Sequence, residues 1–148
     1  MIELLYIVTA LAVGLLAGAL LTEGCILVPY WRKMTPDDFF RLHGSIGPNL
    51  FHYFAPLTTV AVLLSVILGA SDIVANSANS AIRASTLLCV MALAVFFLYF
   101  KKANQKFADH AIPDSALAIE LRRWAAWHWF RTALVVAAFA CLLASPLI

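Results

Sequence analysis

The sequence is short of charge. Only 12% of its 148 residues are Asp, Glu, Lys or Arg, about half of the roughly 25% that is usual in soluble domains. In contrast, 64% of the residues are hydrophobic and the mean hydropathy is +0.92. This composition excludes a soluble domain, and a net charge of +2 is too small to indicate a nucleic-acid partner. We therefore expect a single integral membrane domain over residues 1–148, surrounded by a lipid bilayer.

Motifs that mark metal sites, disulfides or secretion signals are missing. The cysteines lie in apolar segments without CxxC spacing, and neither HxxxH nor ExxH occurs, so local spacing predicts no metal site and no obvious cofactor. No Lys or Arg precedes the first apolar run, which is also too long for the core of a signal peptide. We expect this run to be a retained transmembrane helix. The cysteines, expected to be small packing residues, are Cys25, Cys89 and Cys141.

Long hydrophobic runs are what the sequence does have. A helix needs about 20 apolar residues to cross the ~30 Å hydrocarbon layer of a bilayer. Four stretches come near that length, the last being short with 17 residues from Thr132 to Ile148. We predict an all-α integral membrane protein, a four-helix transmembrane bundle whose apolar third span is scaffold. The first span repeats small residues every four positions, which lets a neighbouring helix approach closely. These residues are Ala10, Gly14, Gly18 and Thr22, and the spans are residues 4–29, 48–70, 84–104 and 122–147.

The loop between the first two spans contains a helix start. Thr35 precedes Pro36 and two acidic residues, which together supply a cap, a proline in the first turn and negative charge near the positive end of the helix dipole. The apolar residues that follow, including Phe39 and Phe40, indicate a short interfacial helix against the membrane surface. His43 belongs to this helix and is expected to be a surface histidine.

The basic residues predict an orientation. Nine of the ten lie in or beside the first and third loops, whereas the second loop has only Arg83. Because loops rich in Lys and Arg stay on the cytoplasmic side, we expect both termini outside the cell membrane (the plasma or inner membrane). The nine residues are Arg32, Lys33, Arg41, Lys101, Lys102, Lys106, Arg122, Arg123 and Arg131.

The last span opens with aromatic and ionisable residues. Because a helix repeats every ~3.6 residues, Trp124, His128 and Arg131 share one face. Ionisable groups at this depth usually face a protein interior or a water-filled cavity. A plainer explanation stays open, because Trp collects at membrane interfaces and Arg snorkels to water. Glu23, at the end of the first span, is expected inside the bundle, with an interfacial position as the alternative.

Two prolines disturb helices at the same end. Pro56 removes the amide that would pair with the carbonyl of His52, and Pro29 does the same to Cys25. In a membrane, such a carbonyl must find a partner on another helix, a water or a ligand.

Polar residues of all four spans thus fall at the end of the bundle where the first and third loops and most basic residues lie. We predict a polar pocket that opens to the cytoplasm above an apolar plug, an arrangement unsuited to a through-channel. Three chemistries fit such a pocket: a Glu–His base pair with Arg131 or His128 stabilising an oxyanion or enolate, a transition-metal site, and a haem b. The metal ligands would be Glu23, His52 and His128, and the haem ligands would be His52 and His128. The catalytic candidates are Glu23, His52, His128 and Arg131, and the substrate-binding candidates are Asn49, Asn104, Trp124 and Trp127.

The layout resembles a known family. Val28-Pro29 closes the first helix, Asn104 follows the third, and Trp124, His128 and Arg131 open the fourth. In these features the chain is similar to the four-helix membrane proteins of the DUF1772 family, which include the anthrone oxygenases. The resemblance covers nearly the whole chain.

The resemblance implies oxidation of an acidic aromatic carbon by molecular oxygen without an organic cofactor. His128 or His52 would then deprotonate a small apolar or aromatic substrate, Arg131 would hold the enolate, and Trp124 and Trp127 would form an aromatic wall. The competing hypothesis is a non-enzyme that binds a lipid, a quinone, a metal or haem, or an accessory subunit of a larger complex.

Overall fold

A bundle of four antiparallel helical rods forms the protein. The structure is a computed structural model that describes residues 2–145, and within this range it contains helices and turns but no strands. Each rod is long and apolar enough to cross a membrane, which confirms the predicted all-α, four-span class. In chain order, the rods are α1 (Ile2–Thr22) with η1 (Glu23–Leu27) and α2 (Val28–Trp31); α3 (Pro36–Val74); α4 (Ser80–Val95) with η2 (Phe96–Phe100) and α5 (Lys101–Ala108); and α6 (Asp114–Ala144).

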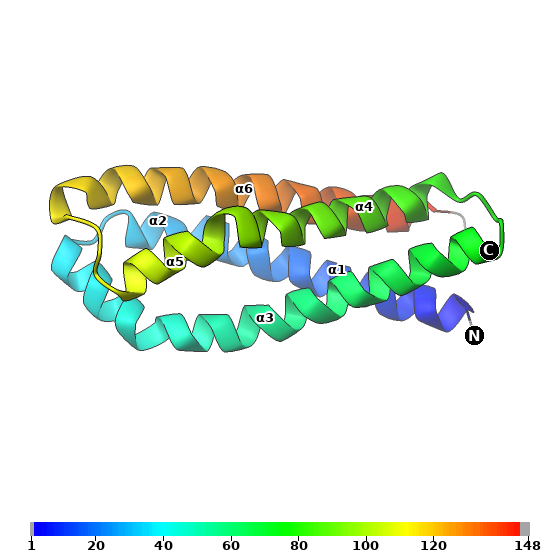
Figure 1. The fold of residues 1–148 in the computed structure, drawn as a ribbon, viewed down its shortest axis with the longest axis horizontal. Coiled ribbons are helices and arrows are strands. Elements are labelled where there is room, and N and C mark those ends of the chain that lie inside the picture. Colours follow the sequence, from blue (N-terminus) through cyan, green and yellow to red (C-terminus); the bar gives the residue numbers. More distant parts are fainter. Residues whose placement is uncertain (1, 146–148) are drawn as a thin grey trace.

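Rods that follow each other in sequence lie side by side, and α6 closes the ring against α1 (Figure 1). The first and last described residues lie at the same end, where the Tyr6 hydroxyl donates to the carbonyl of Leu142. The other end carries the turns at 32–35 and 109–113 and is called the basic end below. Large apolar side chains stay exposed along all four rods, as expected where lipid rather than water surrounds a protein.

The first loop differs from its prediction. Thr35 caps a helix, since its hydroxyl accepts from the backbone amide of Asp38. That helix, however, is not a separate interfacial helix: it is the start of α3, which continues past Pro48 and Pro56 to Val74. The ribbon bends in this first, cyan part of α3 (Figure 1). Phe39 is buried there with its ring 5.3 Å from that of Phe107 in α5, so the segment packs on the bundle rather than on the membrane surface.

The first and third rods each contain one π-helical segment. In η1 the amide of Val28 donates to the carbonyl of Glu23, five residues back, and Pro29 follows directly. The proline supplies no amide for a regular i→i−4 bond, and a π turn is one way to accommodate that loss. In η2 the amide of Lys101 donates to Phe96 in the same manner, without a proline. Such turns occur often at functional sites.

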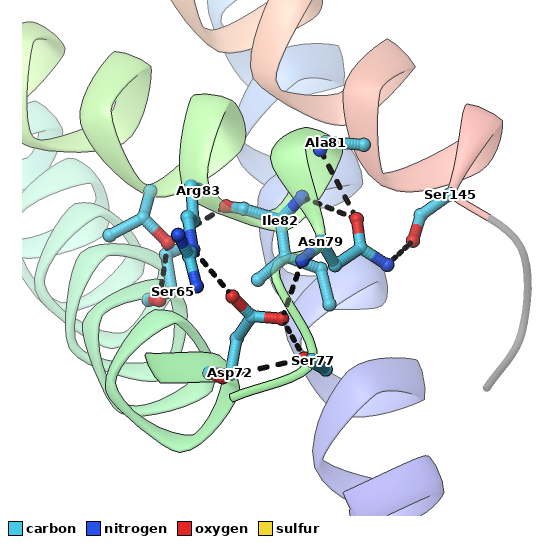
Figure 2. Close-up of polar contacts among 9 residues, drawn as sticks. Ser65, Asp72, Ser77, Asn79, Ala81, Ile82, Arg83 and Ser145 are labelled. Atoms are coloured by element: carbon cyan, nitrogen blue, oxygen red, sulfur yellow. Dashed lines mark hydrogen bonds and ion pairs between the residues drawn. The ribbon is translucent and has the colours of Figure 1, made fainter. Parts of the chain in front are cut away.

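A closed set of polar contacts joins the helices at the end opposite the basic end (Figure 2). The buried carboxylate of Asp72, in the last turn of α3, pairs with Arg83 Nε at 2.7 Å and accepts from the Ser77 hydroxyl and the Asn79 amide. Asn79 in turn caps α4 and donates to Ser145 Oγ at the end of α6. These contacts fasten the loop between α3 and α4 to the end of α6.

The boundaries of the fourth rod also differ from their prediction. The fourth span was predicted to begin at 122, but its helix α6 begins at Asp114. The predicted fourth span ends at 147, and its last two residues lie outside the described part of the chain.

The contact between α3 and α4 gives a stability prediction. A Cβ at Gly69 would lie 2.6 Å from Thr86 Oγ1, and that hydroxyl is held by bonds to the carbonyls of Ser65 and Ile82. Gly69→Ala should therefore destabilise the protein by about 1–3 kcal/mol through overpacking. Gly18→Ala is the matched control, because a Cβ there meets nothing within 4 Å. Measured by thermal unfolding in detergent, the melting temperature should be lower for Gly69→Ala and unchanged for Gly18→Ala. An equal decrease in both variants would contradict this packing.

Candidate functional site

Three ionisable side chains meet inside the bundle near its basic end. Glu23 begins η1 and is 5% exposed, and His128 on α6 is 0% exposed. Glu23 Oε2 lies 3.5 Å from His128 Nδ1 and 3.6 Å from Arg131 Nη2, and the Arg131 side chain is 12% exposed. An interfacial Glu and a snorkelling Arg would both reach water. Both side chains therefore lie inside the bundle, as expected for Glu23.

Hydrogen bonding fixes the orientation of the His128 ring. Its Nε2 lies 2.9 Å from the carbonyl of Leu20 in the last turn of α1. Because a carbonyl can only accept, Nε2 must carry the hydrogen of this bond. The other nitrogen, Nδ1, faces Arg131 Nη2 at 3.4 Å and is an acceptor in the neutral ring. Thr132, one turn further along, donates to the backbone carbonyl of His128.

Aromatic rings hold these groups in place. Trp124 stacks on His128 with ring centroids 5.1 Å apart and 7° between the planes, and its Nε1 donates to Asn104 Oδ1 at 2.9 Å. The ring of Phe100 lies edge-on to Trp124 and beneath the Arg131 guanidinium, 4.3 Å from Cζ to the ring centroid. The cation–π contact stabilises a guanidinium that has little water around it.

The hydrogen bonding of Glu23 and Arg131 is incomplete. Glu23 Oε2 and Arg131 Nε are both buried and have no hydrogen-bond partner among residues 2–145. The distances of 3.5 and 3.6 Å from Oε2 to its neighbours are too long for hydrogen bonds. Arg131 Nε belongs to the same planar guanidinium as Nη2, which lies 3.6 Å from Glu23 Oε2, so the two unpaired atoms lie close together. A molecule that donates to Glu23 and accepts from Arg131 would complete the set.

Both π segments contribute to this cluster. Glu23 is the first residue of η1 and Phe100 is the last residue of η2, on neighbouring sides of His128. The third span, expected to be scaffold, therefore supplies Phe100. Sequence reasoning also missed the Leu20 carbonyl and Gly24, where an added Cβ would lie 3.1 Å from His128 Nε2. The glycine directly after a buried glutamate was the one available signal.

The other candidates lie elsewhere. His52 and Asn49 are exposed on α3, and the structure does not bring them to the cluster. Trp127 is 37% exposed and stacks on Tyr99 outside the Phe100 layer. The proposed metal trio and haem pair both needed His52, and among residues 2–145 no three His, Cys, Asp or Glu side chains come close enough to hold a metal ion.

The expected opening to the cytoplasm is absent from this conformation, at least over the described residues. Buried aromatic rings lie between the cluster and the basic end. Trp31, two turns beyond Glu23, packs on Trp124 with ring centroids 5.7 Å apart, and Phe107 lies two turns beyond Phe100. The polar groups thus form a closed cluster in place of a pocket with an aqueous mouth.

Comparison with known proteins shows no family for this chain. No family model, no curated protein and no solved structure matches the chain. The fold and the cluster together define a class of protein. It is a multi-pass four-helix membrane protein in which a carboxylate, an imidazole and a guanidinium are buried together. The resemblance to the anthrone oxygenases stays a prediction.

Gly24→Ala tests the close fit around His128. The new Cβ, 3.1 Å from both His128 Nε2 and Trp129 Cζ2, would push the imidazole by a few tenths of an ångström and weaken its bond to Leu20. Any activity of the cluster should fall about tenfold, because misplacements below 1 Å already affect reacting groups. The melting temperature should stay near that of Gly18→Ala, assayed in parallel. Unchanged activity would contradict a role for the His128 orientation.

Proposed function

We propose that the protein is a membrane-embedded enzyme that deprotonates a small apolar molecule bearing an acidic hydroxyl or CH group, and oxidises it with O2. The observation that carries this proposal is the pair of unpaired buried atoms, Glu23 Oε2 and Arg131 Nε. An enol or phenol supplies the hydrogen that Oε2 lacks and the lone pair that Nε lacks. After the proton moves to the carboxylate, the guanidinium faces the oxyanion, a charge distribution that a low-dielectric site favours.

The roles of the residues follow from their partners. Glu23 has a free acceptor and is the base, and Arg131 holds the enolate oxygen. His128, whose Nε2 hydrogen is engaged by Leu20, accepts from Arg131 through Nδ1 and so positions the guanidinium. In this mechanism the residue that deprotonates the substrate is Glu23, one of the predicted catalytic candidates, and not His128 or His52. His52 has no role in this mechanism.

Chemistry beyond proton removal rests on the resemblance to anthrone oxygenases. An enolate is electron-rich and reacts with O2 at carbon, which gives a hydroperoxide. Loss of water from this hydroperoxide, which still carries a hydrogen on the same carbon, leaves a ketone. Atoms and electrons balance, because a methylene group and one molecule of O2 give a carbonyl group and one molecule of water. The carbon is oxidised and O2 is reduced in the same sequence, so no further reductant is needed.

We further propose that the protein resides in the cell membrane, a location supported by its four apolar rods. We place the basic end in the cytoplasm, because nine of the ten basic residues lie in or beside the loops at that end. The cluster then sits within the cytoplasmic half of the bilayer.

The test is turnover of anthrone by the purified protein in lipid nanodiscs. Equal amounts of O2 consumed and anthraquinone formed, faster than in empty nanodiscs, would support the proposal. Saturable binding of anthrone without O2 uptake would overturn it in favour of a binding protein. The absence of both binding and turnover would remove anthrone-like molecules as the ligand class.

A further inference from the structure

The cluster is covered very unequally on its different sides. Toward the basic end, Trp31 and Phe107 each lie about seven residues from the level of the cluster, a depth of about 10 Å at ~1.5 Å per residue. Both rings are buried, and the bent start of α3 places Phe39 against Phe107. A path from water would have to displace several packed aromatic rings from three rods.

The side of His128 that faces η1 is also closed. Its Nε2 is bonded to Leu20, and the backbone at Gly24 approaches so closely that a single methyl group would touch the imidazole. Trp129 covers the same glycine from outside, with Cζ2 3.1 Å from the position of an added Cβ. No space for a ligand exists between these groups.

The remaining side lies between η2 and α6, where Arg131 Nε is one of the two unpaired atoms and the Arg131 side chain is 12% exposed. Phe100 lies over Arg131, and the next ring outward is Tyr99, stacked on Trp127 with centroids 5.2 Å apart and 18° between planes. Trp127 is 37% exposed on the outer surface of the bundle. One stacked pair of rings therefore separates the Phe100–Arg131 contact from the surrounding lipid.

Tyr99 has an unusual environment for a covering residue. Its hydroxyl is buried but has no hydrogen-bond partner among residues 2–145, and an unpaired buried hydroxyl is unfavourable. Tyr99 lies within the π-helical segment η2, whose backbone hydrogen bonds differ from those of the α-helices before and after it. Both features suit a ring pair that is held by aromatic contacts and can separate.

We infer that the ligand of this cluster is a bilayer-dissolved, largely apolar molecule that enters sideways between η2 and α6, past Tyr99 and Trp127. The inference rests on the proposed function only in taking the Glu23–His128–Arg131 cluster as a ligand site. It adds the source of the ligand and names the two residues that control its access. A water-soluble, strongly polar molecule is excluded as a substrate by this route.

Thiol labelling measures the route without any need for turnover. In a background with Cys25, Cys89 and Cys141 replaced by Ala, Phe100→Cys places a reporter thiol behind the ring pair. N-(1-pyrenyl)maleimide, which partitions into the nanodisc lipid, should label this thiol about tenfold faster after Trp127→Ala, because thiol reactivity depends on access. The labelling rate with a charged, water-soluble methanethiosulfonate should not increase after Trp127→Ala. The exposed positions Leu98→Cys and Lys102→Cys calibrate the two reagents.

Trp129→Ala is the matched control, since it removes a half-exposed tryptophan from the opposite side of α6. It should leave the labelling of Phe100→Cys unchanged. The inference is overturned if Trp127→Ala gives no increase, if Trp129→Ala gives the same increase, or if the charged reagent reaches the thiol as readily as the lipid-soluble one.

A second reporter covers the case in which Phe100→Cys does not fold. Arg131→Cys combined with Glu23→Gln reports on the same space from α6 and leaves no unpaired charge behind. The expected and contradicting outcomes are those given for Phe100→Cys. Labelling that follows this pattern while anthrone is not oxidised would leave the lateral route standing and reject the reaction; oxidation without the labelling pattern would do the reverse.

Discussion

Glu23→Gln is expected to lower turnover by roughly 10²–10⁴-fold, the range that a positioned general base contributes. The amide keeps the size of the side chain but cannot take a proton from the substrate. It also presents an amide NH or a neutral oxygen to the space beside Arg131, so binding should change much less than turnover. Initial rates of O2 consumption with anthrone, at saturating substrate, measure the effect.

Glu3→Gln is the control for this prediction. It makes the same substitution on the same rod, but at an exposed position far from the cluster, and should leave the rate unchanged. If Glu23→Gln retained more than about a tenth of the wild-type rate, Glu23 would not be the base. His128→Ala would then be the next variant to examine, because Nδ1 is the other acceptor that borders the same space.

Arg131→Met is expected to be the most destabilising single change in the cluster, by about 3–5 kcal/mol, because it leaves the buried Glu23 without its cationic partner. Combining it with Glu23→Gln should restore most of that loss, since no charge is then left in the apolar interior. Unfolding of the single and double variants in mixed micelles gives the two free energies of unfolding.

The matched control is Arg122→Met, an exposed position on the same helix that should change the stability by no more than about 0.5 kcal/mol. If the double variant were as unstable as Arg131→Met, the pairing of Glu23 with Arg131 would not be what stabilises this part of the bundle. Loss of the packing of the arginine stem over Phe100 would be the remaining explanation.

Contacts within one helix could be predicted from the sequence, because the helical period fixes them. Trp124, His128 and Arg131 share a face for this reason, and the burial of Trp124 and His128 shows that the face points inward. Their proximity to Glu23 followed from the topology, since all lie at one end of antiparallel rods. The four spans themselves followed from hydropathy.

The rotation of each helix about its axis could not be predicted. Placing His52 at the right level of the bundle did not say which way it faces, and the long, bent α3 leaves it exposed. The π turn at η2 was invisible for a related reason: it follows no proline, and one extra residue in a helical turn leaves no mark in an apolar sequence. Phe100 was therefore expected to be scaffold although it contacts Arg131.

The continuity of α3 was missed because two prolines and a polar loop composition favour a break. Buried aromatic contacts outweigh that preference, since Phe39 and Phe40 pack on Phe107 and His110 of the third rod and its turn. Tertiary packing of this kind depends on residues far apart in the sequence and has no local signature.

The central claim, that Glu23 and Arg131 share the hydroxyl of an ionised ligand, is tested most directly by the absorption spectrum of anthrone mixed with the protein in the absence of O2. Without O2 the reaction stops at the enolate, which absorbs at longer wavelength than anthrone itself. The wild-type protein should produce this band at a pH at which free anthrone shows none, and Glu23→Gln and the Glu23→Gln/Arg131→Met variant should not. A spectrum of unchanged anthrone with the wild-type protein, or the same band with all three proteins, would contradict the claim.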